Sequence, residues 1–90
     1  MEDRELERLR GAIDRVDAEL LRLFAERMRL VEQIGARKTE QGIAVRDAGR
    51  EAEILARVRA QAGAALADEA EALFRELLAL SRARQERRHT

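Results

Sequence analysis

The sequence contains no cysteine and no proline, and its only aromatic residues are two phenylalanines, 2% of the chain. Without cysteine the chain has neither a disulfide framework nor thiolate chemistry. Without Trp or Tyr, a domain of 90 residues must build its core mainly from Leu, Ile, Val and Ala. Such a core is marginal for one small chain, and oligomerisation is a usual remedy. We therefore expect a partner to complete it.

The chain also lacks an excess of charge and any long apolar run. Its 18 basic and 18 acidic residues give a net charge of zero, which argues against a nucleic-acid-binding protein that works by bulk charge. No apolar segment approaches the length of a membrane span, and no signal-peptide core is present. The single histidine, His89, lies near the C-terminus, where we expect a solvated residue and not a metal ligand. These absences predict a cytoplasmic protein that binds neither nucleic acid nor membrane.

Helix-forming residues, by contrast, are abundant. Ala, Leu, Glu and Arg dominate, whereas the β-branched and aromatic residues that favour strands are scarce. The sequence therefore predicts an all-α fold with three helices, over residues 5–40, 48–62 and 66–87. Gly42 suits the position just past the first helix, and Asp47 is a good N-cap for the second. Asp68 or a neighbouring residue is expected to open the third.

The first predicted helix carries an apolar seam with heptad spacing. The seam consists of Leu6, Leu9, Ile13, Val16, Leu20, Leu23, Leu30 and Ile34. A helix of this length extends for about 50 Å at about 1.5 Å per residue. The two shorter helices cannot cover that length and also bury their own apolar faces. We therefore expect a homodimer in which the long first helices pair.

Polar residues interrupt the inward face of each predicted helix. Arg27 occupies a seam position, where a buried guanidinium requires an anionic partner or a polar cavity, and Lys38 lies three turns further along roughly the same side. Glu51 extends the apolar stripe of the second helix backwards, and Ser81 and Gln85 continue that of the third. Taken singly, an arginine such as Arg27 more often lays its stem on the core with its head in water, and Glu51 could stabilise the dipole of the second helix. Residues such as Ser81 and Gln85 are more often surface or helix–helix hydrogen-bonding residues. Together they describe a polar pocket for a compact anion bearing a hydroxyl group.

A longer pattern runs through Leu9-Arg10 with Ile13 and Asp17, Leu20-Leu21, Ala25-Glu26-Arg27, Gly35-Ala36-Arg37-Lys38, Val45-Arg46-Asp47, Arg50-Glu51, and Ser81 with Gln85. In order and spacing it resembles the all-helical (AroQ-class) chorismate mutases over nearly the whole chain. Met28 and Gly49 depart from that family, because they stand where related enzymes often have polar residues. The resemblance implies one chorismate mutase domain over residues 1–90, an intertwined homodimer, and no second catalytic domain.

The resemblance also implies a role for each polar residue. The substrate is expected to be chorismate, which carries two carboxylates, a ring hydroxyl and an enolpyruvyl ether. Lys38 and Gln85 would be catalytic, because both would contact the ether oxygen, and Lys38 would also bind the enolpyruvyl carboxylate. Arg27, assisted by Ser81, would bind the ring carboxylate. Arg10 would reach the enolpyruvyl carboxylate from the other subunit.

The remaining edge of the implied site comes from the start of the second helix. Glu51, with the backbone near Asp47, would hold the ring hydroxyl, and Arg50 would support this edge. The rearrangement to prephenate is pericyclic and takes place within one molecule. It requires neither metal nor cofactor, and we expect none. It does require a compact conformer of the dianion, which fixed cations can impose.

Two other functions remain open on the sequence alone. An isochorismate–pyruvate lyase has the same fold and a similar cationic pocket, so the polar residues do not reject it. The segments Val45-Arg46-Asp47 and Arg50-Glu51 resemble the mutases better. A non-enzymatic dimeric helical module is the third reading, and it would make Arg27, Lys38 and Gln85 dispensable surface residues.

Overall fold

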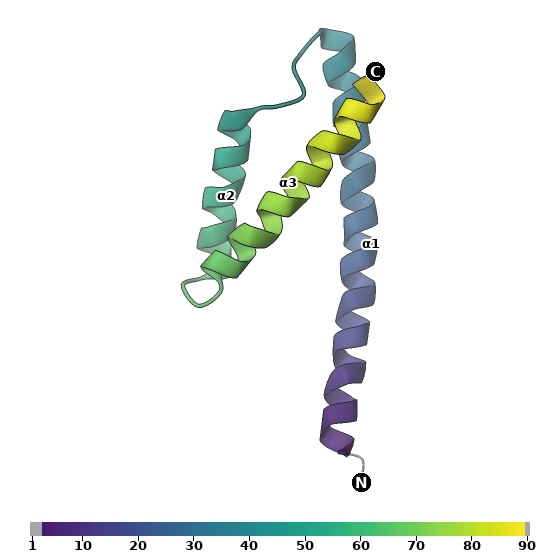
Figure 1. Cartoon of the computed structure of the whole chain (residues 1–90), viewed down its shortest axis with the longest axis vertical. Coiled ribbons are helices and arrows are strands. Elements are labelled where there is room, and N and C mark those ends of the chain that lie inside the picture. Colours follow the sequence, from purple (N-terminus) through teal and green to yellow (C-terminus); the bar gives the residue numbers. More distant parts are fainter. Residues whose placement is uncertain (1–2, 90) are drawn as a thin grey trace. The chain divides into compact units, whose positions relative to one another are not determined.

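The computed structural model describes residues 3–89, and side chains for residues 3–87. In that part of the chain it contains three helices and no strand: α1 (Arg4–Gln41), α2 (Ala48–Ala62) and α3 (Ala67–His89) (Figure 1). The predicted all-α fold is confirmed, and every helix boundary lies within two residues of its predicted place. The side chain of His89, predicted to be solvated, lies outside the described side chains. The chain divides into two compact units, residues 1–30 and residues 31–90, and each is described by itself.

The first unit is the N-terminal part of α1 and carries most of the apolar seam. Asp3 caps this helix, because its carboxylate accepts hydrogen bonds from the backbone N–H groups of Glu5 and Leu6 at 3.0 and 3.2 Å. The seam side chains are between 43% and 59% exposed in the single chain. The seam is therefore not buried within the single chain, as we expected from a first helix too long for the two shorter helices to cover. None of the helices within residues 3–89 combines the length and apolar character needed to cross a membrane.

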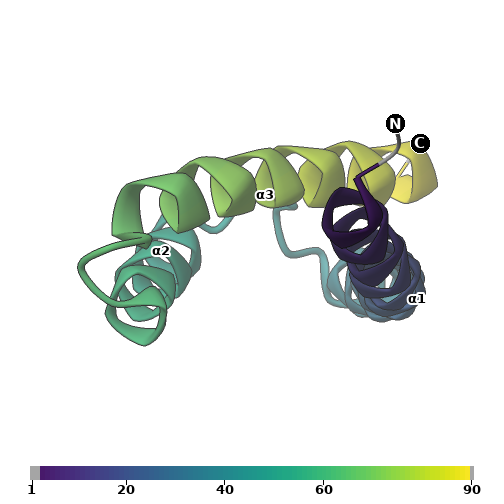
Figure 2. The same ribbon diagram turned by 90° about the horizontal axis from the view of Figure 1, so that it is seen from below.

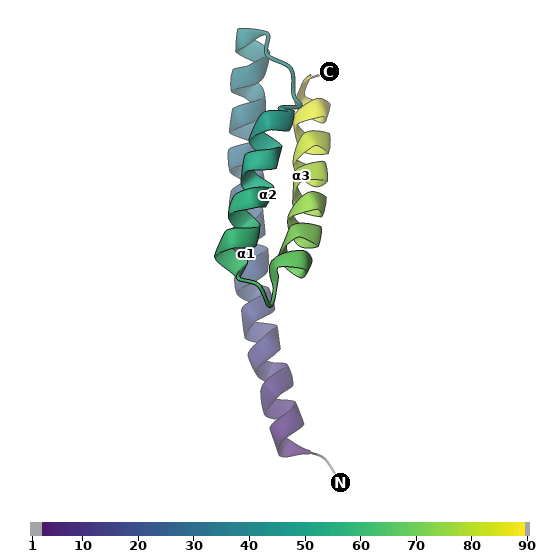
Figure 3. The same ribbon diagram turned by 90° about the vertical axis from the view of Figure 1, so that its left-hand side faces the viewer.

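The loop over residues 42–47 joins α1 to α2 (Figure 3). It has a cap at each end, as predicted. Gly42 has a φ of +66°, and its N–H donates to the carbonyl of Thr39 at 3.2 Å. The N–H of Ile43 donates to the carbonyl of Lys38 at 2.8 Å, which completes a Schellman motif. On the other side, the Asp47 carboxylate accepts a hydrogen bond from the N–H of Arg50 at 3.0 Å and so caps α2.

In the second unit, α2 and α3 form a helical hairpin with a short turn at Gly63. Figure 2 shows α2 beneath the N-terminal half of α3. The inward stripes predicted for these helices are confirmed, because their members are buried or half-buried: Leu55, Val58 and Ala62 on α2, and Ala70, Phe74 and Leu78 on α3. α3 begins at Ala67, one residue before Asp68, so that Asp68 and Glu69 lie in its first turn. These carboxylates face the positive end of the helix dipole.

Within the second unit, the end of α1 uses a face beside the seam. Val31 and Gly35 are its buried residues, whereas the seam residues Leu30 and Ile34 are about half exposed. The Glu32 carboxylate accepts a hydrogen bond from the Arg84 guanidinium at 2.6 Å, which ties this segment to α3. Residues 31–41 therefore use one face for the chain's own α3 and leave the seam face uncovered.

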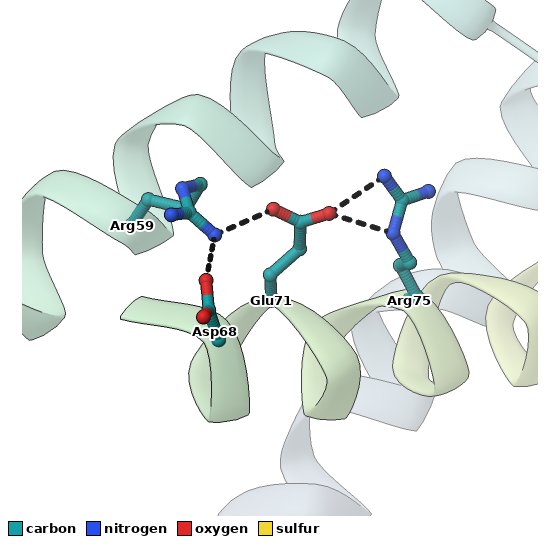
Figure 4. Close-up of polar contacts among 4 residues, drawn as sticks. All are labelled: Arg59, Asp68, Glu71 and Arg75. Atoms are coloured by element: carbon teal, nitrogen blue, oxygen red, sulfur yellow. Dashed lines mark hydrogen bonds and ion pairs between the residues drawn. The ribbon is translucent and has the colours of Figure 1, made fainter. Parts of the chain in front are cut away.

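A network of charged side chains joins α2 and α3 near their turn (Figure 4). Arg59 of α2 donates to the carboxylates of Asp68 at 3.0 Å and Glu71 at 2.9 Å. Glu71 also accepts a hydrogen bond from Arg75, one turn along α3, at 2.9 Å. The hydrogen bonds from Arg75 and then Arg59 lower the pKa of the Glu71 carboxyl below its ordinary value of 4.5. Glu71 therefore links folding to pH.

Replacing Glu71 with glutamine is expected to lower the unfolding free energy at neutral pH, and the loss is expected to shrink in acid. Because the folded pKa lies below the unfolded one, the stabilisation is complete above pH 4.5 and disappears as pH falls through the folded value. Urea denaturation followed by circular dichroism, at neutral pH and well below pH 4.5, measures the difference. Glu76→Gln on the same helix is the control, since Glu76 is exposed and has no ion pair in the described chain. A Glu71→Gln deficit that stays constant into acid would refute the linkage.

Candidate active site

Lys38 and Gln85 meet where the end of α1 packs on α3, although they lie 47 residues apart in the sequence. The Lys38 ammonium donates to the Gln85 side-chain carbonyl at 3.3 Å and to the backbone carbonyl of Val45 at 2.6 Å. Gln85 is 7% exposed, and Lys38 is half-buried. An ammonium has three N–H donors, so one remains for a ligand after these two hydrogen bonds.

The contact with Lys38 decides how the Gln85 amide is turned. An ammonium can only donate, so the amide oxygen must face it and the NH₂ group must point away. In the described chain no fully buried side-chain nitrogen or oxygen lacks a hydrogen bond. The Gln85 NH₂ group makes none there, so it reaches accessible space. Lys38 and Gln85 thus offer an ammonium and a neutral amide donor at one place.

Ser81 lies one turn before Gln85 on the same face of α3, as predicted. It is 7% exposed, and its hydroxyl donates to the carbonyl of Leu77 at 2.7 Å. This bond to the preceding turn is common for serine inside a helix and orients the hydroxyl oxygen. The inward stripe of α3 therefore changes from apolar to polar after Leu78.

At the start of α2, the side chains of three predicted residues make different contacts. Asp47 uses its carboxylate as the N-cap. The Glu51 carboxylate accepts a hydrogen bond from the Arg82 guanidinium of α3 at 2.6 Å, and both side chains are mostly buried. The Arg50 guanidinium lies 3.6 Å from the Glu53 carboxylate and is more than half exposed. Of the three, only Glu51 makes a side-chain contact with α3.

Arg10 and Arg27 belong to the first unit. Arg10 is exposed, whereas Arg27 is half-buried, and burial lowers the pKa of the Arg27 guanidinium. An arginine stays protonated in spite of such a shift, so this burial is favourable only where the surroundings compensate the charge. The half-buried cation at a seam position agrees with the reasoning from the sequence.

Comparison with known families matches residues 9–86 to chorismate mutase type II. The chain belongs to this family. A curated relative, the bifunctional chorismate mutase/prephenate dehydratase of Aquifex aeolicus (strain VF5), is 41% identical over 54 residues. That alignment covers 60% of this chain and 15% of the relative, so the chain spans only a small part of the longer protein. The predicted resemblance is confirmed. The family match over residues 9–86 spans the positions of all the predicted site residues.

The structure brings together part of the predicted site in this member of the chorismate mutase type II family. It brings Lys38 and Gln85 into contact, with Ser81 one helical turn away. It places Glu51 against α3 through Arg82. Arg50 is turned towards Glu53, and Arg10 and Arg27 lie in the other unit. The catalytic and binding roles of all the predicted site residues stay predictions, those of the residues that the structure brings together included.

Sequence reasoning missed three contributors to this site. The Val45 carbonyl binds Lys38, and a backbone group leaves no signal in side-chain pattern. Gly35 lets α1 approach closely, since a Cβ there would lie 3.1 Å from Cγ of Gln85. Arg82 follows Ser81 directly, but only packing shows that it reaches Glu51. The one sequence signal for the close approach of α1 to α3 was the glycine at position 35, one turn before Lys38.

Proposed function

We propose that this protein is a chorismate mutase, which converts chorismate to prephenate. The contact of Lys38 with Gln85 is the observation that carries the proposal, because it supplies two hydrogen-bond donors in a buried setting. The breaking C–O bond of chorismate builds negative charge on the ether oxygen. Donors directed at that oxygen stabilise the transition state more than the ground state, which raises kcat.

The cationic residues hold the substrate in its reactive conformation. Chorismate is a dianion, and its carboxylates must be held in a compact, chair-like conformer before the rearrangement. Arg27, with Ser81, binds the ring carboxylate, and Arg10 of a second subunit binds the enolpyruvyl carboxylate together with Lys38. Holding the reacting ends together supplies part of the acceleration, and a millionfold rate increase requires about 8 kcal/mol in total.

The ring hydroxyl is held at the start of α2. Glu51 accepts its hydrogen bond, the backbone near Asp47 contributes, and Arg50 supports this edge. A carboxylate can only accept, so it favours a hydroxyl over the two carboxylates and the ether of the substrate. This part of the site orients chorismate and takes no part in bond breaking.

The proposed active form is a homodimer in the cytoplasm. The half-exposed seam of α1 supports it, because burial of a half-exposed large aliphatic side chain contributes about 1 kcal/mol, and the two copies offer many such residues. Pairing of the seams also brings Arg10 of each chain to the partner. The dimer then completes both the core and the site.

Assays with chorismate and isochorismate test the function. Prephenate formation from chorismate is the expected result. Pyruvate release from isochorismate without prephenate formation would instead establish the lyase. Inactivity on both substrates would favour the non-enzymatic helical module.

The Gly35→Ala variant is expected to lower kcat roughly tenfold with little change in stability, because a sub-ångström misplacement of a catalytic group is costly. The new Cβ would lie 3.1 Å from Cγ of Gln85, so the Gln85 side chain must give way by a few tenths of an ångström, whereas the 3.5 Å to its Cα is an ordinary contact. Alanine is more favourable than glycine in a helix by about 1 kcal/mol, and this gain in stability offsets the cost of the crowding. Steady-state kinetics and thermal denaturation measure both effects.

Gly49→Ala is the matched control for this prediction. Gly49 lies in α2, and a Cβ there meets only Asp47 Oδ1 at 3.6 Å, an ordinary contact. We expect this variant to keep its kcat and to gain up to about 1 kcal/mol of stability. Full activity of Gly35→Ala would show that the close approach to Gln85 is not needed.

A further inference from the structure

The ion pair of Arg82 with Glu51 is more sheltered from solvent than the exposed ion pairs along α1. The Arg82 guanidinium donates to Glu51 Oε1 at 2.6 Å, and the two side chains are 27% and 18% exposed. In the pair of Arg8 with Glu5 in α1, by contrast, both side chains are more than 60% exposed. A sheltered pair is screened less by water and salt, so it restrains its members more strongly.

The position of the pair connects it with the candidate site. Arg82 stands directly after Ser81 and three residues before Gln85, one helical turn away. Glu51 lies in the first turn of α2, one turn after the Asp47 cap. The ion pair therefore joins the start of α2 to the segment of α3 that carries the two buried polar residues.

We propose that Arg82 is a positioning residue that holds the Glu51 carboxylate in one orientation, with its second oxygen presented to the ring hydroxyl of the substrate. This inference rests on the proposed chorismate mutase function. A carboxylate accepts hydrogen bonds at both oxygens, and within residues 3–87 only Arg82 donates to that of Glu51, at Oε1. Oε2 is left for the ligand.

The charge of Arg82 is as important as its hydrogen bond. The substrate carries two negative charges, and an uncompensated Glu51 would repel it in a partly buried site. The Arg82 guanidinium compensates the Glu51 charge without blocking both oxygens. It also keeps a flexible side chain in one rotamer before binding, which lowers the entropic cost of recognition.

This role has a distinct kinetic signature. The ring hydroxyl takes no part in bond breaking, so its hydrogen bond is equally strong in the ground state and the transition state. Loss of such uniform binding raises KM and leaves kcat unchanged. A merely structural role predicts the opposite, since partial unfolding removes active enzyme and lowers the observed kcat at constant KM.

The test measures the kinetics of Arg82→Gln in the full-length chain with chorismate. We expect KM to rise roughly tenfold, the order expected for loss of one hydrogen bond to a charged group, with kcat unchanged. Arg82→Lys keeps the charge and is expected to restore part of the KM. If Arg82→Gln does not fold by circular dichroism, Arg82→Lys carries the test, with a smaller rise in KM.

Arg59→Gln is the matched control variant. Arg59 also bridges α2 and α3, through Asp68 and Glu71, but at the turn of the hairpin (Figure 4). Its loss removes a contact between the same two helices and is expected to leave KM unchanged. An equal rise of KM in Arg59→Gln would assign the effect to helix packing and overturn the positioning role.

A substrate analogue separates the hydroxyl from the rest of the site. With chorismate whose ring hydroxyl is replaced by hydrogen, Arg82→Gln is expected to raise KM less than it does with chorismate, because only the charge compensation of Glu51 is then lost. An equal rise in KM with both substrates, or no rise with chorismate, would refute the proposal. Absence of turnover in the unsubstituted protein would instead refute the proposed function, so the two failures are distinguishable.

Discussion

Replacing Lys38 with alanine is expected to lower kcat on chorismate by at least about a hundredfold, because one preorganised donor to a developing negative charge commonly contributes 10²–10³ in rate. Gln85→Ala is expected to cause a comparable loss, since it removes the second donor and the acceptor that orients the Lys38 ammonium at 3.3 Å. Steady-state measurement of prephenate formation gives kcat. Circular dichroism and sedimentation show whether the fold and the assembly are retained.

Arg37→Ala is the control for the loss of a cation from α1. Arg37 adjoins Lys38, but its guanidinium is 71% exposed and lies 3.6 Å from the Glu40 carboxylate. We expect this variant to keep full activity. If Lys38→Ala and Gln85→Ala both also kept full activity, the assignment of the active site would be wrong.

Mixing two inactive variants is expected to restore activity if each site uses residues of both subunits. Arg10→Ala chains supply an intact Lys38, and Lys38→Ala chains supply an intact Arg10. Each heterodimer then holds one complete site and one site that lacks both residues. After random exchange, half of the dimers are mixed, so roughly a quarter of all sites recover in a symmetric dimer. The specific activity of the mixture, measured after exchange, checks this value.

A second mixture controls for unspecific rescue. Lys38 and Gln85 contact each other within one chain, at 3.3 Å. A heterodimer of Lys38→Ala and Gln85→Ala chains therefore has one of the two residues missing at each site, and no activity is expected. Failure of the Arg10 and Lys38 variants to rescue each other, with subunit exchange confirmed by mass spectrometry, would argue against a shared site.

Much of the fold could be predicted from the sequence because helices depend on local interactions. The positions of the helix ends follow from neighbouring residues: Gly42 adopts a φ that other residues avoid, and Asp47 caps the N–H of Arg50. The 3.6-residue period identified the inward stripes of α2 and α3. It also singled out Ser81 and Gln85 as polar members of a buried face, and both are 7% exposed.

The face that α1 turns towards α3 could not be derived from the period alone. The seam predicted one apolar face for the whole helix, and Leu30 and Ile34 belong to it. In residues 31–41 the buried residues are instead Val31 and Gly35. Glycine has no apolar side chain, so a hydrophobic pattern does not identify it as a core residue. Gly35 is buried because its missing side chain leaves space for Gln85.

The sequence by itself determined the three helices and their caps, because these depend on near neighbours. It also determined an apolar seam that the chain does not bury and membership of the chorismate mutase family, because both follow from residue order. Only the tertiary structure decided which polar groups meet. The Lys38 ammonium lies against Gln85 and the Val45 carbonyl, and Arg82 reaches Glu51. Hydrogen bonds between residues tens of positions apart depend on how helices pack, to within a fraction of an ångström. No periodic pattern carries that information.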